Sequence, residues 1–193
     1  LEIKLLRFQP IEQHPPLHTL NKSGQRFLLG EYQQQALTNP LALEKILRAV
    51  RGRSKDVAIS ASHTLLKVPG LSPDKVQFLL KSPFAGVRVN GLAILAQLDG
   101  AESPLGASIV AQSCCVLVAE RDQAVARHLC DLLAPWVKRE QQVPRDILPA
   151  LVTLPERLVA QNLFDGGTAS SLMAALKVIA QSEENTVDDA MHG

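Results

Sequence analysis

The sequence has few aromatic residues and few cysteines, and these shortages exclude several classes of protein. Aromatic side chains make up only 4% of the 193 residues, whereas Leu and Ala occupy most apolar positions. Sheets are enriched in aromatic and β-branched residues, so this composition favours closely packed helices. The three cysteines are odd in number, which argues against a disulfide framework. We therefore expect an all-α protein in a reducing, intracellular compartment, either the cytoplasm or the nucleus.

The sequence also lacks a long apolar run. A membrane-spanning helix needs about 20 apolar residues, and the nearest candidate, residues 109–119, is shorter and contains Gln112 and Ser113. The first residues lack the apolar core and the cleavage site of a signal peptide. We therefore expect no contact with a membrane. Because the sequence begins with Leu, we also expect it to be a piece of a larger protein or complex.

The residue patterns of common catalytic sites are missing as well. No glycine-rich phosphate loop occurs. His128, Cys130 and Asp131 are close in sequence, but neighbours one or two positions apart on a helix point in different directions. Cys114 and Cys115 lie in a segment too apolar to stabilise a thiolate. We therefore expect no catalysis, no metal site and no cofactor.

A helical unit with a regular apolar face occupies residues 82–100. Its face carries Val87, Gly91, Leu95 and Leu98, which are spaced at i, i+4, i+8 and i+11. Glycine inside a helix costs about 1 kcal/mol relative to alanine. We expect Gly91 to offset this cost by letting a neighbouring helix approach closely.

The same spacing recurs on both sides of this unit. It is found upstream at Val57, Ala61, Leu65 and Val68, and downstream at Val125, Leu129, Leu133 and Trp136. A shorter apolar helical segment that begins at a proline precedes each unit, at residues 40–50, 73–80 and 104–119. Tandem helix pairs of about 30 to 40 residues are typical of an α-solenoid.

In detail, the pattern resembles HEAT and armadillo repeats, whose second helix opens with an acidic residue, a valine and then a basic or small residue. Residues 55–57, 86–88 and 121–125 supply pieces of that pattern. The resemblance covers about residues 40–163 and implies antiparallel helix pairs stacked as a short solenoid. We expect a helical-repeat domain over residues 21–181 and an acidic, flexible tail over residues 182–193.

Some enzymes share this fold, but their site residues are not matched here. In the metal-dependent hydroxylases of this fold, His-Glu pairs are repeated across the helices. The sequence has no His-Glu dipeptide. The HEAT-like DNA glycosylases place aromatic and acidic residues in a basic channel. Trp136, Tyr32 and Asp131 match them in residue type only, and Trp136 stands at a core position of the repeat. The resemblance therefore implies a non-catalytic scaffold or adaptor that binds a protein partner along its second helices.

The beginning of the chain is rich in proline. Three prolines fall within residues 10–16, so we expect residues 1–20 to form an extended arm or linker rather than a helix. If Ile3, Leu5 and Phe8 dock on the helices, they cap the solenoid; otherwise, the arm is a linker to a missing neighbour. Asn21 is a candidate N-cap for a first helix that ends near residue 37.

Positive charge is concentrated in the first half of the chain. Residues 1–100 hold 13 Lys and Arg against 7 Asp and Glu, whereas the net charge of the whole chain is +1. The candidate partner-binding residues are the basic run and one arginine further on: Lys45, Arg48, Arg51, Arg53, Lys55 and Arg88.

Three interpretations of this basic surface remain open. It binds an acidic protein partner, it contacts nucleic-acid phosphates, or it is simply a solvated helix face. No aromatic residue interleaves the charges in the sequence, so stacking of bases has no platform there. We expect the protein partner first and nucleic acid as the alternative.

Overall fold

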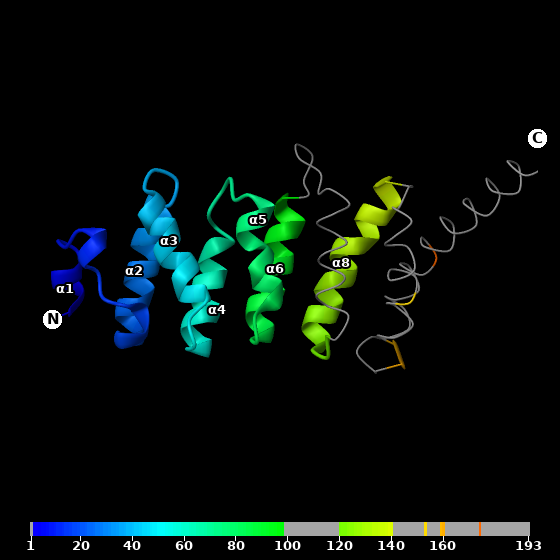
Figure 1. Ribbon diagram of the computed structural model, residues 1–193, viewed down its shortest axis with the longest axis horizontal. Helices are drawn as coiled ribbons and strands as arrows, with labels where there is room; N and C mark the ends of the chain where they lie inside the picture. The colour runs from blue at the N-terminus through cyan, green and yellow to red at the C-terminus, as the bar shows by residue number, and fades with distance from the viewer. Residues whose placement is uncertain (1, 99–119, 141–152, 154–158, 161–173, 175–193) are drawn as a thin grey trace, which may run out of the picture. The chain divides into compact units, whose positions relative to one another are not determined.

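The computed structural model describes residues 2–98, 120–140, 153, 159–160 and 174. The chain divides into two compact units, Leu1–Leu98 and Asp99–Gly193. Over the described residues, all regular structure is helical and no strand occurs, which confirms the expected all-α class. The first unit is coloured from blue to green in Figure 1. The expected domain boundaries near residues 20 and 181 stay predictions, and the acidic tail lies outside the described residues.

The N-terminal arm (residues 1–20) is helical in part. It contains α1 (Glu2–Leu6) and two 3-10 helices, η1 (Ile11–Gln13) and η2 (Leu17–Thr19). Our expectation of an extended arm without helix is therefore wrong. Pro10 and Pro16 are the N-caps of η1 and η2, and a 3-10 turn needs so few residues that it fits between prolines.

The arm packs on the helices that follow it, but not through the side chains we expected. Phe8 is 86% exposed and Leu5 is 62% exposed, so neither docks. The buried side chains are instead Leu6, Ile11 and Leu17. Through these elements, α1 and η2 contact the second helix of the chain, and η1 contacts the third. The arm therefore belongs to the first compact unit.

Two asparagines begin the next helices. The Oδ1 atom of Asn21 accepts a hydrogen bond of 2.8 Å from the backbone N–H of Gly24 and caps α2 (Lys22–Gln35), as the sequence predicted. Asn39 caps α3 (Pro40–Val50) in the same way. Each cap satisfies a backbone donor that has no partner within its helix.

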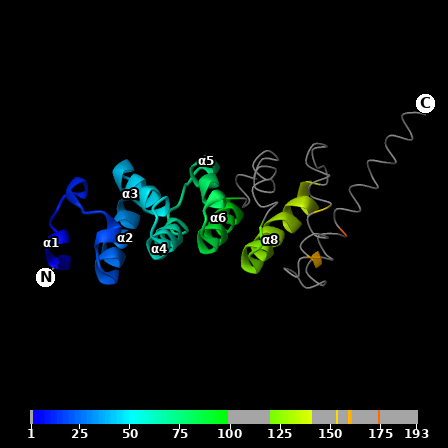
Figure 2. The same ribbon diagram turned by 60° about the horizontal axis from the view of Figure 1, so that its bottom comes forward.

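Helix α4 (Lys55–Leu65) follows α3 after a short connection, the 51–54 turn, and packs against it as a helical hairpin. The apolar face predicted from the sequence is buried: Val57, Ala61, Leu65 and Val68. Gly70 then adopts a φ of +70°, a left-handed conformation that favours glycine. Helices α2, α3, α4 and α6 follow one another in chain order in both views (Figures 1 and 2).

Helix α6 (Ala85–Leu98) packs closely on what precedes it, namely α4, α5 (Pro73–Val76) and η3 (Gln77–Lys81). A Cβ atom added at Gly91 would lie 2.8 Å from the Cβ atom of Leu79. The predicted close approach at Gly91 is therefore confirmed. The Nδ2 group of Asn90 also donates a hydrogen bond of 2.8 Å to the Oγ atom of Ser62 on α4.

In the second unit, the longest stretch that the structure describes is α8 (Gln123–Glu140) with the three residues before it. Asp122 caps the helix, because its Oδ1 atom accepts hydrogen bonds from the backbone N–H groups of Ala124 and Val125. Three of the four predicted face residues are buried: Val125, Leu129 and Leu133. The side chain of Trp136 and residues 104–119 lie outside the description.

Candidate functional site

The predicted cationic residues lie on several elements of the first unit. Lys45 and Arg48 are on α3, Arg51 and Arg53 are in the 51–54 turn, Lys55 opens α4, and Arg88 is on α6. The sequence could not show what lies between them. The structure places a cavity on each side of the 51–54 turn.

The first cavity has a volume of about 700 Å³. Residues 14–18 of the arm form one wall, and α3, the turn and Val57 of α4 form the other. The lining is mostly apolar, and Lys45, Arg48 and Arg53 are its cationic members. Among the described residues that line it, none is Asp or Glu. Its size falls within the range of about 300 to 1,000 Å³ that is typical of ligand pockets.

A buried histidine fixes the arm side of the first cavity. The Nε2 atom of His14 lies 3.0 Å from the carbonyl oxygen of Gln9, and its Nδ1 atom lies 3.2 Å from the hydroxyl of Tyr32. Because a carbonyl only accepts, Nε2–H is the donor to Gln9, and in the neutral ring Nδ1 accepts from Tyr32. Burial raises the pKa of Tyr32 to about 12, so its hydroxyl keeps its proton.

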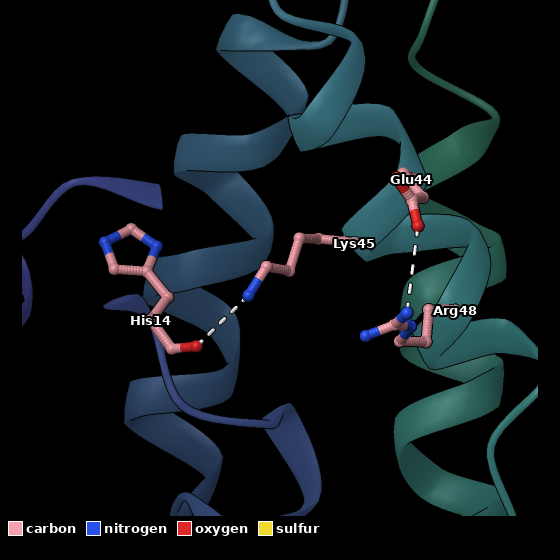
Figure 3. Close-up of polar contacts among 4 residues, drawn as sticks. All are labelled: His14, Glu44, Lys45 and Arg48. Carbon is pink, nitrogen blue, oxygen red and sulfur yellow. Dashed lines mark hydrogen bonds and ion pairs between the residues drawn. The ribbon is translucent and has the colours of Figure 1, made fainter. Parts of the chain in front are cut away.

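Lys45 and Arg48 have different contact partners at this cavity, as Figure 3 shows. The Nζ group of Lys45 reaches from α3 to the arm and donates a hydrogen bond of 3.2 Å to the carbonyl oxygen of His14. Arg48 stays beside its own helix, where its guanidinium lies 3.8 Å from the carboxylate of Glu44. The side chain of Arg48 is 80% exposed, and such an i,i+4 surface pair is worth only about 0.3–0.5 kcal/mol. Arg48 is therefore accessible to a ligand.

The second cavity has a volume of about 380 Å³. Its apolar members include Phe78 and Phe84, and its cations are Arg51, Arg53 and Lys81. The guanidinium carbon of Arg51 lies 4.3 Å from the centre of the Phe78 ring, a cation–π contact. Again, none of the described lining residues is Asp or Glu. No aromatic residue stands among the charges in the sequence, but in the structure Phe78 lies against Arg51 and Phe84 lines the same cavity. Our expectation that the charges have no aromatic neighbour is therefore wrong.

The two cavities meet at the turn, because Gly52 and Arg53 line both of them. A Cβ atom at Gly52 would lie 3.0 Å from the carbonyl oxygen of Ala49, so glycine allows this tight connection. Lys55 and Arg88 line neither cavity. Arg88 donates a hydrogen bond of 2.8 Å to the carbonyl oxygen of Ser82. The structure thus brings four of the six predicted residues together at the cavities.

The sequence did not identify the arm residues 14–18 as part of the first cavity, nor Phe78, Lys81 and Phe84 as part of the second. The prolines at positions 15 and 16 indicated an interruption of helix there, but they could not show where the arm would pack. The later residues are some thirty positions from the basic run, so only the fold brings them beside Arg51 and Arg53.

The residues of the His128, Cys130 and Asp131 group differ in their surroundings on α8. The Nδ1–H group of His128 donates to the carbonyl oxygen of Ala124 at 2.9 Å. Cys130 is buried, and burial and the charge of Asp131 raise the pKa of its thiol to about 12. Asp131 is exposed. A thiol with so high a pKa is a poor nucleophile at neutral pH.

Within the described ranges, no group of three or more His, Cys, Asp or Glu side chains is placed to hold a metal ion. The helices that the structure describes include none with the length and apolar character to cross a membrane. No family model, curated protein or solved structure matches the chain.

Proposed function

We propose that this chain is a non-catalytic helical-repeat scaffold or adaptor that binds an acidic segment of a protein partner around the 51–54 turn. One observation carries the proposal. Two adjoining cavities share Gly52 and Arg53 of that turn, and their described linings contain five cationic side chains and no carboxylate. A surface of this kind attracts negative charge, and at Arg48 a bound carboxylate competes with the 3.8 Å contact to Glu44.

The packing of the first unit supports the repeat part of the proposal. Helices α3 and α4 form one hairpin, and the segment of α5 and η3 packs with α6 as a second pair. Helix α4 contacts α6, so the second helix of one pair lies on the second helix of the next. This is the order of contacts expected for stacked HEAT-type repeats. We place the protein inside the cell on the cysteine pattern of its sequence.

Charge alone would give only weak binding. An exposed ion pair contributes about 0.2–1 kcal/mol and is weakened by salt. The apolar walls offer the larger contribution, because buried apolar surface is worth about 25 cal/mol per Å². The cavities therefore favour a protein segment, which carries both carboxylates and apolar side chains.

Nucleic-acid binding is the second candidate, and the second cavity favours it. Arg51 lies over Phe78, and Phe84 lines the same cavity, so cations and aromatic rings stand together there. Single-stranded nucleic acids bind through such combinations of charge and stacking. However, the guanidinium of Arg51 already covers one face of Phe78, which reduces the platform for a base.

A charge-reversal experiment separates the two candidates. The variant Arg48→Glu, Arg51→Glu, Arg53→Glu is compared with a control that reverses three exposed lysines away from both cavities, Lys22→Glu, Lys67→Glu and Lys75→Glu. Fluorescence anisotropy measures binding of a labelled poly-glutamate peptide, an RNA single strand and a DNA duplex at about 0.15 M salt.

We expect the wild type and the control to bind the peptide and the site variant to lose it. We expect no binding of either nucleic acid by the wild type at that salt. Binding of RNA or DNA by the wild type but not by the site variant, with a logarithmic salt slope of about −0.7 to −0.9 per phosphate, would replace the proposal with the alternative.

A further inference from the structure

The apolar and cationic groups of the two cavities define the chemistry of the occupant more narrowly. The first cavity has Pro15, Leu17 and Val57 in its walls, and the second has Phe78 and Phe84. Walls of this kind favour apolar side chains, because removing apolar surface from water lowers the free energy. An occupant made of charge alone would leave these walls uncovered.

The cations impose the opposite requirement. Within the described residues, Arg53 and Lys81 form no ion pair, and Arg48 has only the long contact with Glu44. Covering such side chains with an uncharged, apolar occupant removes water from them without replacing its hydrogen bonds, which is costly. The occupant therefore has to bring carboxylates to the cationic residues as well as apolar groups to the walls.

The shared lining indicates a single occupant. Because Gly52 and Arg53 line both cavities, a chain that leaves the first cavity over the turn enters the second. Arg53 is exposed and is the cation that the two linings have in common. One peptide segment can therefore occupy both cavities. A compact small molecule would occupy only one of them.

From these observations, and resting on the proposed function, we infer that the partner contributes one extended acidic segment that crosses the 51–54 turn. It places an apolar side chain in each cavity, and its carboxylates meet Arg48 and Arg53 on one side and Lys81 on the other. The specificity of the site thus lies in the pairing of apolar and acidic side chains within one segment.

Labelled peptides of equal length test the inference. One contains only glutamate, the second has leucine at every third position among glutamates, and the third has lysine in place of the glutamates of the second. Two unlabelled competitors, decanoate and an RNA single strand, represent other occupants. We expect the acidic and apolar peptide to bind at least about tenfold more tightly than poly-glutamate, and the lysine peptide not to bind.

Two variants locate the effect. Ala49→Phe fills the first cavity without changing charge, and Ala96→Phe on the exposed side of α6 is its matched control. Lys81→Glu changes the second cavity, and Lys75→Glu, which lines neither cavity, is its control. We expect Ala49→Phe and Lys81→Glu each to weaken the acidic and apolar peptide about tenfold, and both controls to bind like the wild type. Circular dichroism shows that each variant is folded.

The outcomes separate the inference from the proposed function. Equal binding of poly-glutamate and the acidic and apolar peptide would overturn the inference and leave the proposed function standing. Loss of binding in Ala49→Phe without any effect of Lys81→Glu would show that the peptide uses the first cavity alone. It would overturn the inference that one segment crosses the 51–54 turn. Failure of both acidic peptides to bind, or binding of decanoate or RNA in their place, would overturn both.

Discussion

The first unit packs closely where α6 meets α4 and η3, and it leaves open space around the 51–54 turn. At the closed junction, where α6 meets α4 and η3, small residues let the chain approach: a Cβ at Gly86 would lie 3.0 Å from Ile59, and one at Gly91 would lie 2.8 Å from Leu79. At the open junction, the arm, α3 and the 51–54 turn line the first cavity, and the turn and residues from the 78–84 segment line the second, with cations in both linings.

This difference has a physical cause in the side chains at each junction. Glycines remove the atoms that keep two helices apart, so α6 approaches α4 and η3 closely at the closed junction. At the open junction, the prolines of the arm and the long side chains of α3 and the turn do not fill the space between the arm and α3, and the first cavity remains there. The closed junction therefore stabilises the unit, whereas the open junction provides a surface for binding.

The largest expected effect comes from making a cavity in the closed junction. Leu79 is fully buried and lies against Gly91. We expect Leu79→Ala to lower the free energy of unfolding by about 2–5 kcal/mol, measured by urea denaturation. Leu37→Ala is the matched control, because Leu37 is 66% exposed and its loss should change stability by less than about 0.5 kcal/mol. Equal effects of the two changes would mean that the closed junction is not packed as described.

A smaller effect is expected from adding one methyl group to the same junction. Gly91→Ala gains about 1 kcal/mol of helix propensity but forces the backbone of α6 away from Leu79, which costs about 1–3 kcal/mol. We expect a net loss of stability. Gly30→Ala on α2 is the control, since its added Cβ would meet no atom within 4 Å beyond its own local helix backbone, and only the gain remains. Stabilisation by both substitutions would contradict the close approach.

The next prediction concerns the wall of the open junction. Tyr32→Phe removes the hydroxyl that donates to His14, and we expect a loss of about 1 kcal/mol at neutral pH. The folded-state pKa of Tyr32 is about 12 and its ordinary value is 10.0, so the unfolded chain loses the proton first. This contribution to stability is therefore complete below about pH 10 and declines as the pH rises toward 12.

Absorbance titration checks this prediction, because Tyr32 is the single tyrosine of the chain. Tyrosinate should appear near pH 12 in the folded protein and near pH 10 in urea. Cys130 also loses its proton in this alkaline range, so the stability curve of the wild type is compared with that of Tyr32→Phe. A folded-state titration near pH 10 would show that the hydroxyl is not buried beside His14.

Local patterns in the sequence were sufficient to predict much of the closed junction. Helical spacing identified the buried face of α4 and, on α6, the role of Gly91, because a helix repeats its contacts every three or four residues. The Asn21 cap of α2 was predictable for the same reason, because it depends on a residue only three positions away. The stacking of these pairs into a HEAT-type solenoid stays a proposal.

The open junction was less predictable because it depends on contacts between distant residues. The basic run was visible in the sequence, but the cavities that its residues line and the contact of Arg51 with Phe78 were not. The hydrogen bond from Lys45 to His14 joins residues thirty-one positions apart. The arm was predicted wrongly because prolines were taken as barriers to helix, whereas two of them begin 3-10 turns.

The most direct test of the account is a map of where an acidic segment binds. Backbone amide signals are followed by NMR while the unlabelled peptide of glutamate and leucine is added to the isotope-labelled protein. We predict that the signals of Ala49, Gly52 and Arg53 at the open junction move, and that those of Ser62 and Asn90 at the closed junction do not. Movement at Ser62 and Asn90 with unchanged signals at Gly52 and Arg53 would contradict the account.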